Sequence, residues 1–185
     1  MTGKVIEKDS VHPRLNVMDE MDMELLYREG SERIYNFLFK FTNNSELSQD
    51  LLQDTFLNFF KRYKNQALGK DNAMMILYTI ARNNSINHFK KASNRKEMPI
   101  LYDAKDQQES FADKLEKSDL QAQLLQCLQE LPEDQKTAVI LKNMDDLKLQ
   151  EIATIMDTSI SSVSRLIVKG TSHLLQTAAK KGIQL

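Results

Sequence analysis

Basic side chains are concentrated in one stretch of the chain, residues 61–96, where nine Lys or Arg residues stand against one acid, Asp71. Cations gathered in this way can neutralise phosphates, and the release of condensed counterions then favours binding. The same stretch holds amide and imidazole side chains, which can hydrogen-bond the edges of nucleic-acid bases. The candidates for contact with a nucleic acid are Arg82, Asn83, Asn84, Asn87, His88, Lys90 and Lys91. The alternative is that these charges only cover a solvated helix face.

The basic stretch is flanked by two acidic ones, so the net charge of −1 hides a strong segregation. Residues 19–60 contain nine Asp or Glu against three Lys or Arg, and residues 97–134 contain ten against three. A chain patterned in this way indicates more than one partner, at least one of them an anion.

The residue types that enzymes use are not arranged for catalysis in this sequence. It has no paired carboxylates in a cleft-forming context, no Gly-rich phosphate loop and no metal-ligand spacing, and His12, His88 and His173 are scattered. We therefore expect no enzyme, no catalytic residue, no cofactor and no metal site. The single cysteine, Cys127, follows an apolar helical pattern, which favours a buried packing residue over a redox switch.

The sequence also carries no signal for a membrane. No apolar run reaches the ~20 residues needed to span a bilayer. Residues 1–20 are charged throughout and lack the apolar region of a secretory signal. The expected location is the cytoplasm, without membrane contact.

Helix formers dominate, with only 5 Gly and 3 Pro, so the sequence predicts an all-α fold of two small helical domains joined by a flexible linker. Apolar spacing predicts helices over residues 21–42, 46–63 and 73–92, with Ser45 as the N-cap of the second. The predicted divisions are a flexible tail at 1–19, a first domain at 20–92, a linker at 93–118 that contains Pro99, and a second domain at 119–181.

The second domain carries a helix-turn-helix pattern. Residues 149–156 read as a short amphipathic helix, residues 157–159 as a tight turn, and Ser159 or Ser161 as the cap of a second helix. In a helix-turn-helix the second helix enters the major groove of DNA. With Val163 and Ile167 facing inward, the candidate DNA contacts are Ser162, Ser164, Arg165, Leu166 and Lys169. An ordinary helical hairpin is the alternative.

Four segments resemble extracytoplasmic-function sigma factors, in the family's own order. Residues 49–57, QDLLQDTFL, resemble the family's EDLVQETFL signature. Residues 77–83 and 87–91, LYTIARN and NHFKK, resemble its LYRIARN…DHLRR segment. The LPE at 131–133 and the EIA at 151–153 resemble its LPE…EEIA pattern.

The resemblance implies a sigma factor that binds core RNA polymerase and directs promoter-specific transcription initiation. The first domain is then sigma region 2 and docks on the core through the solvent side of its second helix, at Asp50, Gln53, Asp54 and Asn58. The basic third helix is then the minus-ten reader, and the helix-turn-helix domain, sigma region 4, recognises the minus-35 element of promoter DNA. The family also implies an anti-sigma factor as a partner. Tyr63 and Tyr78 are aromatic candidates to stack on an unpaired base, although packing in the core is favoured for both.

The chain departs from the family in its recognition helix, where only Arg165 and Lys169 are basic. Each missing phosphate contact removes favourable counterion release, so we expect the second domain alone to bind DNA weakly. Leu166 either touches a thymine methyl or belongs to a patch for a protein partner. Two alternatives to a working sigma factor remain: a stand-alone helix-turn-helix regulator, and a sigma-like interaction protein with degenerate DNA reading.

Overall fold

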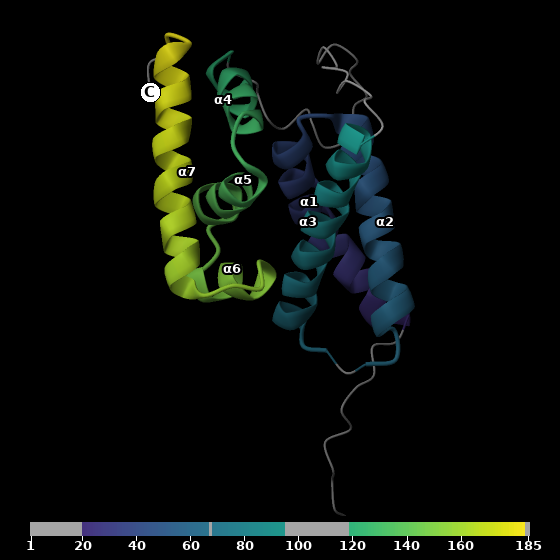
Figure 1. The fold of residues 1–185 in the computed structure, drawn as a ribbon. Coiled ribbons are helices and arrows are strands. Elements are labelled where there is room, and N and C mark those ends of the chain that lie inside the picture. The colour runs from purple at the N-terminus through teal and green to yellow at the C-terminus, as the bar shows by residue number, and fades with distance from the viewer. Residues whose placement is uncertain (1–19, 67, 95–118, 184–185) are drawn as a thin grey trace, which may run out of the picture.

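The structure, a computed structural model, describes residues 20–66, 68–94 and 119–183, and all the regular elements in these ranges are helical (Figure 1). This confirms the expected all-α fold. The elements are α1 Glu20–Thr42, α2 Ser45–Tyr63, α3 Lys70–Asn94, α4 Asp119–Gln129, α5 Glu133–Val139, the π-helical segment η2 Ile140–Met144, α6 Leu149–Ile155 and α7 Ile160–Lys180. The predicted tail and almost all of the predicted linker lie outside the described residues.

The first three helices form a bundle around aromatic side chains. On α1, Ile34, Phe37, Leu38 and Phe41 follow one another at spacings of three and one residues, which brings them to one face of the helix, and all four are fully buried. The ring of Phe37 meets the buried Tyr78 of α3 edge to face, with 5.6 Å between centroids. This packing fixes α3, and with it the outward face of its candidate contact residues.

The turn between α1 and α2 depends on two asparagines. Asn43 has a φ of 51°, in the left-handed region that asparagine tolerates, and this reverses the chain. Asn44 is the N-cap of α2, because its Oδ1 accepts a hydrogen bond from the backbone N–H of Leu47 at 2.9 Å. The prediction of Ser45 as N-cap was therefore wrong by one residue. Helix α3 also begins earlier than predicted, at Lys70.

Helices α4, α5 and α6 pack against α7. Pro132 is extended at the start of α5, where its missing N–H costs nothing. Helix α5 passes directly into η2, and α7 crosses α5 at Gly170, where a Cβ would lie 2.7 Å from Cγ2 of Val139. Cys127 is fully buried, as predicted from its apolar neighbours.

The two helical groups are in contact. Figure 1 shows α4, α5 and α6 between the α1–α3 bundle and α7, so that α7 lies on the side away from the bundle. Buried residues of both groups belong to one hydrophobic cluster, and polar contacts join α1 and α3 to the second group.

Candidate DNA and polymerase interfaces

The outward face of α3 presents most of the predicted minus-ten residues to solvent. Asn83, Asn87, Lys90 and Lys91 recur at helical spacing on one side of α3, and all four are exposed. His88 is exposed as well. These side chains can contact phosphates or base edges without any rearrangement of the helix.

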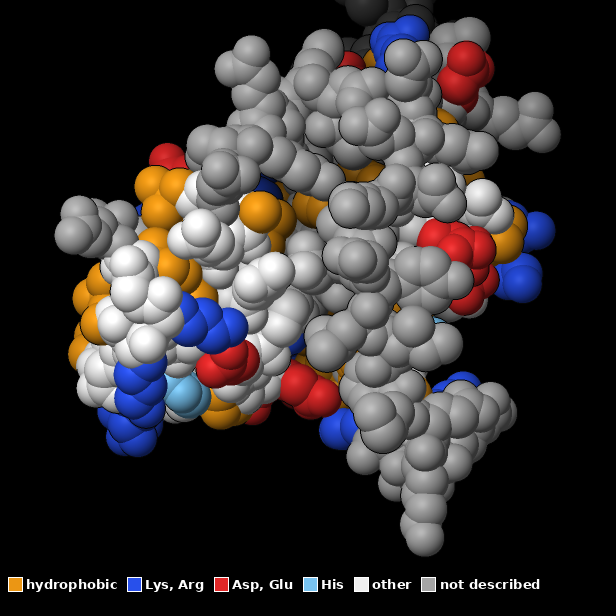
Figure 2. Space-filling view, turned by 90° about the horizontal axis from the view of Figure 1, so that it is seen from above, with side chains coloured by type: hydrophobic (Ala, Val, Ile, Leu, Met, Phe, Trp, Pro, Cys, Tyr) orange, Lys and Arg blue, Asp and Glu red, His pale blue; other side chains and the backbone are white. Residues whose placement is uncertain are grey.

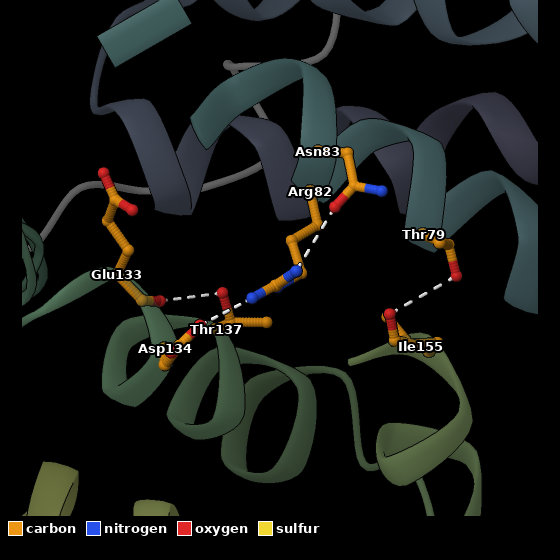
Figure 3. A network of polar contacts seen from close by, with 7 residues as sticks. All are labelled: Thr79, Arg82, Asn83, Glu133, Asp134, Thr137 and Ile155. Atoms are coloured by element: carbon orange, nitrogen blue, oxygen red, sulfur yellow. Dashed lines mark hydrogen bonds and ion pairs between the residues drawn. The ribbon is translucent and has the colours of Figure 1, made fainter. Parts of the chain in front are cut away.

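Two of the predicted minus-ten residues are held differently. The side chain of Arg82 is only 15% exposed, because its Nη2 forms an ion pair with Oδ1 of Asp134 on α5 at 2.5 Å. Its Nη1 also donates to the side-chain oxygen of Asn83 at 3.2 Å (Figure 3). Asn84 is partly buried, and its Nδ2 has no hydrogen-bond partner among the described residues. Arg82 is therefore positioned at the edge of the candidate DNA face but is already bound within the protein.

Tyr63 and Tyr78, the two aromatic candidates for stacking on a base, differ in their exposure to solvent. Tyr78 is buried in the bundle, and this burial, with a smaller effect from the charge of Asp145, raises the pKa of its phenol far above the usual value. Tyr63 is half-buried and packs on Phe59, with 5.3 Å between ring centroids. Only Tyr63 retains a surface on which a base could stack.

The start of α7 shows why the recognition helix begins where it does. Oγ of Ser159 accepts a hydrogen bond from the backbone N–H of Ser162 at 3.1 Å, so Ser159 rather than Ser161 is the N-cap. The hydroxyl of Ser162 accepts from Nη2 of Arg165 at 3.3 Å. Ser164, Arg165 and Lys169 are exposed, as predicted. The two cations lie one turn apart on the outer face of α7.

Leu166 does not face outward as predicted. It is half-buried and packs against the hydrophobic core, because it follows the buried Val163 by three residues and so falls on the inner side of α7. Among the large apolar side chains of α7, the most exposed is Val168, at 67%. Counting the helical period from both Val163 and the buried Gly170 would have assigned these positions from the sequence.

The solvent side of α2 carries the predicted polymerase contacts. Asp50, Gln53, Asp54 and Asn58 are all exposed, whereas Leu51, Leu52, Thr55 and Phe56 are buried in the bundle. Leu57 lies among the exposed residues, is 51% exposed, and was not among the predicted contacts. An acidic and amide face around one apolar side chain suits a partner helix with cations around an apolar position.

The charges do not merge into one broad surface of a single sign on the face drawn in Figure 2. In its described part, Lys and Arg lie close to Asp and Glu. Among the described residues there is no group of three His, Cys, Asp or Glu that could hold a metal ion. No helix in the described ranges is both long enough and apolar enough to cross a membrane.

A helical bundle with an exposed polar helix, followed by a helix-turn-helix with a capped recognition helix, defines a DNA-binding protein of two helical domains. The family described as Sigma-70 region 2 matches residues 26–95, and that described as Sigma-70, region 4 matches residues 121–174. The chain belongs to the sigma-70 family and is an extracytoplasmic-function sigma factor, as the sequence motifs predicted. Sigma factors are regulatory proteins without catalytic activity.

Curated relatives agree with this assignment along most of their length. The chain is 29% identical over 167 residues to the RNA polymerase sigma factor YlaC of Bacillus subtilis (strain 168), covering 85% of this chain and 92% of the relative. It is 26% identical over 163 residues to the RNA polymerase sigma-H factor of Pseudomonas aeruginosa, covering 82% and 83%.

Two solved structures share the fold. The sigma factor RpoE of Bartonella quintana, in complex with the anti-sigma factor NepR, has a TM-score of 0.67 at 17% identity, over 85% of this chain and 97% of that one. CnrH, in complex with the cytosolic domain of CnrY, has a TM-score of 0.64 at 15% identity, over 88% and 90%. At these identities the likeness concerns the arrangement of the helices.

Proposed function

We propose that this chain binds core RNA polymerase and directs initiation at promoters by recognising their minus-ten and minus-35 elements. In this proposal region 2 comprises residues 20–92 and region 4 comprises residues 119–181, joined by a linker at 93–118. Asp50, Gln53, Asp54 and Asn58 of α2 contact the polymerase, and Leu57 joins them.

The DNA contacts of the proposal lie on two other helices. The minus-ten element binds α3 at Arg82, Asn83, Asn84, Asn87, His88, Lys90 and Lys91. The minus-35 element binds α7 at Ser162, Ser164, Arg165 and Lys169, with Leu166 reaching DNA only by its exposed part. The supporting observation is that three separate helices of one chain, in the order of the family's regions, each present a polar face to solvent.

An anti-sigma factor is the further proposed partner, because the two solved structures described above are complexes with other chains, one of them an anti-sigma factor. The protein would act on the chromosome, which places it in the cytoplasm, and it would perform no chemistry of its own.

In vitro transcription tests the function directly. Core polymerase from the same source is incubated with fragmented genomic DNA, with and without the chain, and start sites are mapped. New start sites that share upstream motifs are the expected result. A stable complex with core but no new starts would instead support a sigma-like interaction protein, and no binding to core would leave a helix-turn-helix regulator.

We expect α7 to bind DNA weakly, because Arg165 and Lys169 are the cations on the first half of its outer face. We expect the affinity of the full chain for a minus-35 duplex to fall about tenfold or less between 50 and 200 mM salt, because two phosphate contacts release few counterions. Binding titrations at both salt concentrations measure this. A fall of a thousandfold would contradict it.

A further inference from the structure

The face of region 4 that meets region 2 begins at the N-terminus of α5. Asp134, in the first turn of α5, holds Nη2 of Arg82 on α3 at 2.5 Å. On the same side of α3, Oγ1 of Thr79 lies 3.5 Å from the backbone oxygen of Ile155 at the end of α6 (Figure 3). Region 4 thus covers one flank of the helix that carries the candidate minus-ten residues.

A second set of polar contacts joins region 4 to α1. Nζ of Lys40 pairs with Oδ1 of Asp145 at 2.7 Å, and the carboxylate of Asp145 is only 7% exposed. Nζ of Lys136 donates to the backbone oxygen of Phe41 at 3.3 Å. Gln129 donates to the backbone oxygen of Lys40 at 3.1 Å. The two regions are therefore joined by charge pairs and hydrogen bonds spread over three elements of region 4, in addition to the hydrophobic cluster that they share.

The same interface leaves polar groups unsatisfied. The hydroxyl of Tyr78, Nε of Arg82 and Oδ2 of Asp145 are buried without a hydrogen-bond partner among the described residues. Burying such groups costs free energy that water would recover if the regions separated. These unsatisfied groups offset part of the free energy gained from the shared hydrophobic cluster, so the docked regions can separate more easily than the halves of a fully satisfied core.

The docked arrangement affects the three candidate surfaces unequally. The exposed faces of α2 and α7 remain open to solvent. On α3, by contrast, Arg82 is already paired with the carboxylate of Asp134. A guanidinium binds a carboxylate through the same N–H groups that would bind a DNA phosphate. Docking therefore competes with the minus-ten surface and leaves the polymerase-binding surface free.

We propose that Asp134 is an intramolecular competitor of promoter DNA: in the free protein it occupies Arg82 and holds region 4 against region 2, and minus-ten DNA binds fully only when this contact opens. The proposal rests on the proposed function of α3. It adds that the chain restrains its own DNA binding without a second protein.

The test uses the full chain and two charge-neutralising variants. Asp134→Asn removes the negative charge that pairs with Arg82, and Glu133→Gln removes the same charge from the same helical turn as the matched control. Donor and acceptor dyes on Glu46→Cys of α2 and Gln176→Cys of α7, both exposed positions, report the separation of the regions, since Cys127 is buried. Circular dichroism checks that helix content is unchanged.

The first readout is energy transfer in the free protein, and the second is affinity for a random-sequence single-stranded DNA pool at fixed salt. Asp134→Asn is expected to lower energy transfer and to tighten DNA binding about two- to fivefold, the range expected for losing one competing ion pair whose acid is largely exposed. Glu133→Gln is expected to change neither readout by as much as about twofold.

Three results would overturn the proposal. Unchanged energy transfer in Asp134→Asn would show that the ion pair does not hold the regions together. A lower energy transfer with unchanged DNA affinity would show that docking does not compete with DNA. An equal gain in DNA affinity in both variants would show that the gain comes from the change in net charge and not from the loss of the contact with Arg82. Failure of the proposed function would appear separately, as a wild-type chain that does not support transcription with core polymerase.

Discussion

Lys136 is a cation in an unusual place, nearly inaccessible to solvent at the contact between α5 and the bundle. Its Nζ donates to the backbone oxygen of Phe41 and to Oε1 of Gln129, and it lies 5.0 Å from the centroid of the Phe41 ring. These contacts do not replace the water that it loses, since burial lowers the pKa of Lys136 to about 8 from the ordinary 10.5.

We expect Lys136→Met to raise the free energy of unfolding at pH 7 by roughly 1–3 kcal/mol, because a buried charge is replaced by an apolar chain of similar length. The lowered pKa also fixes a pH dependence. Between pH 8 and 10.5 the unfolded chain binds more protons at this residue than the folded one, so wild-type stability rises over that window through Lys136. Urea titrations at pH 7 and pH 10 measure both effects. A destabilised variant that keeps the wild-type pH slope would contradict the argument.

Gly170 is a second residue whose identity is dictated by its neighbours. A Cβ there would lie 2.7 Å from Cγ2 of Val139 and 3.1 Å from the backbone oxygen of Gln135. Gly170→Ala is therefore expected to lower the free energy of unfolding by about 1–3 kcal/mol through overpacking between α5 and α7. Gly69→Ala is the control, because nothing lies within 4 Å of its Cβ. Equal thermal denaturation midpoints for the two variants would refute this.

At the scale of elements, the structure of the start of α2 shows which of two neighbouring residues, Asn44 or Ser45, is the N-cap, which the sequence alone did not decide. Asn44 accepts from the N–H of Leu47, and Ser45 is the first residue of the helix. Asn44→Ala should lower the free energy of unfolding by about 1 kcal/mol, while Ser45→Ala should have little effect, because only Asn44 satisfies an otherwise free N–H. Chemical denaturation of both variants decides between the two residues, and a larger loss in Ser45→Ala would restore it as the cap.

The sequence predicted the helices well because their apolar residues recur at the helical period, as in the buried series of α1 and α2. It could not place the ends to the residue, since Asn44 and Ser45 are both good capping residues and their local geometry decides. In α7 the prediction of which side chains face outward was wrong at Leu166. Leu166 and Val168 differ by two positions, and Gly170, which packs on α5, marks the inner side of the helix on which Leu166 lies.

The candidate sites were predictable to a similar degree. Local exposure on α2 and α3 follows from the helical period, and most of the predicted contact residues there face solvent. The engagement of Arg82 was not predictable, because Asp134 is 52 residues away in the sequence and no local pattern links the two. Contacts of this kind depend on how whole domains meet.

At the scale of the whole molecule, the docked form cannot read both promoter elements at once. Elements centred about 25 base pairs apart lie about 85 Å apart along B-form DNA. A compact chain of 185 residues has a radius of gyration of only about 16 Å. Since α3 and α7 are parts of one packed cluster, region 4 must leave region 2 before both contacts form.

This predicts that the dyes on α2 and α7 move apart when the chain joins core polymerase and a promoter that it recognises. Energy transfer should fall in the promoter complex to nearly zero, because the new separation exceeds the span of the docked molecule by a large margin. Core polymerase without DNA is the informative comparison: since the α2 face is exposed in the docked form, polymerase binding need not open the molecule, whereas occupation of both elements must. Unchanged energy transfer in a complex that initiates transcription would mean that only one element is read.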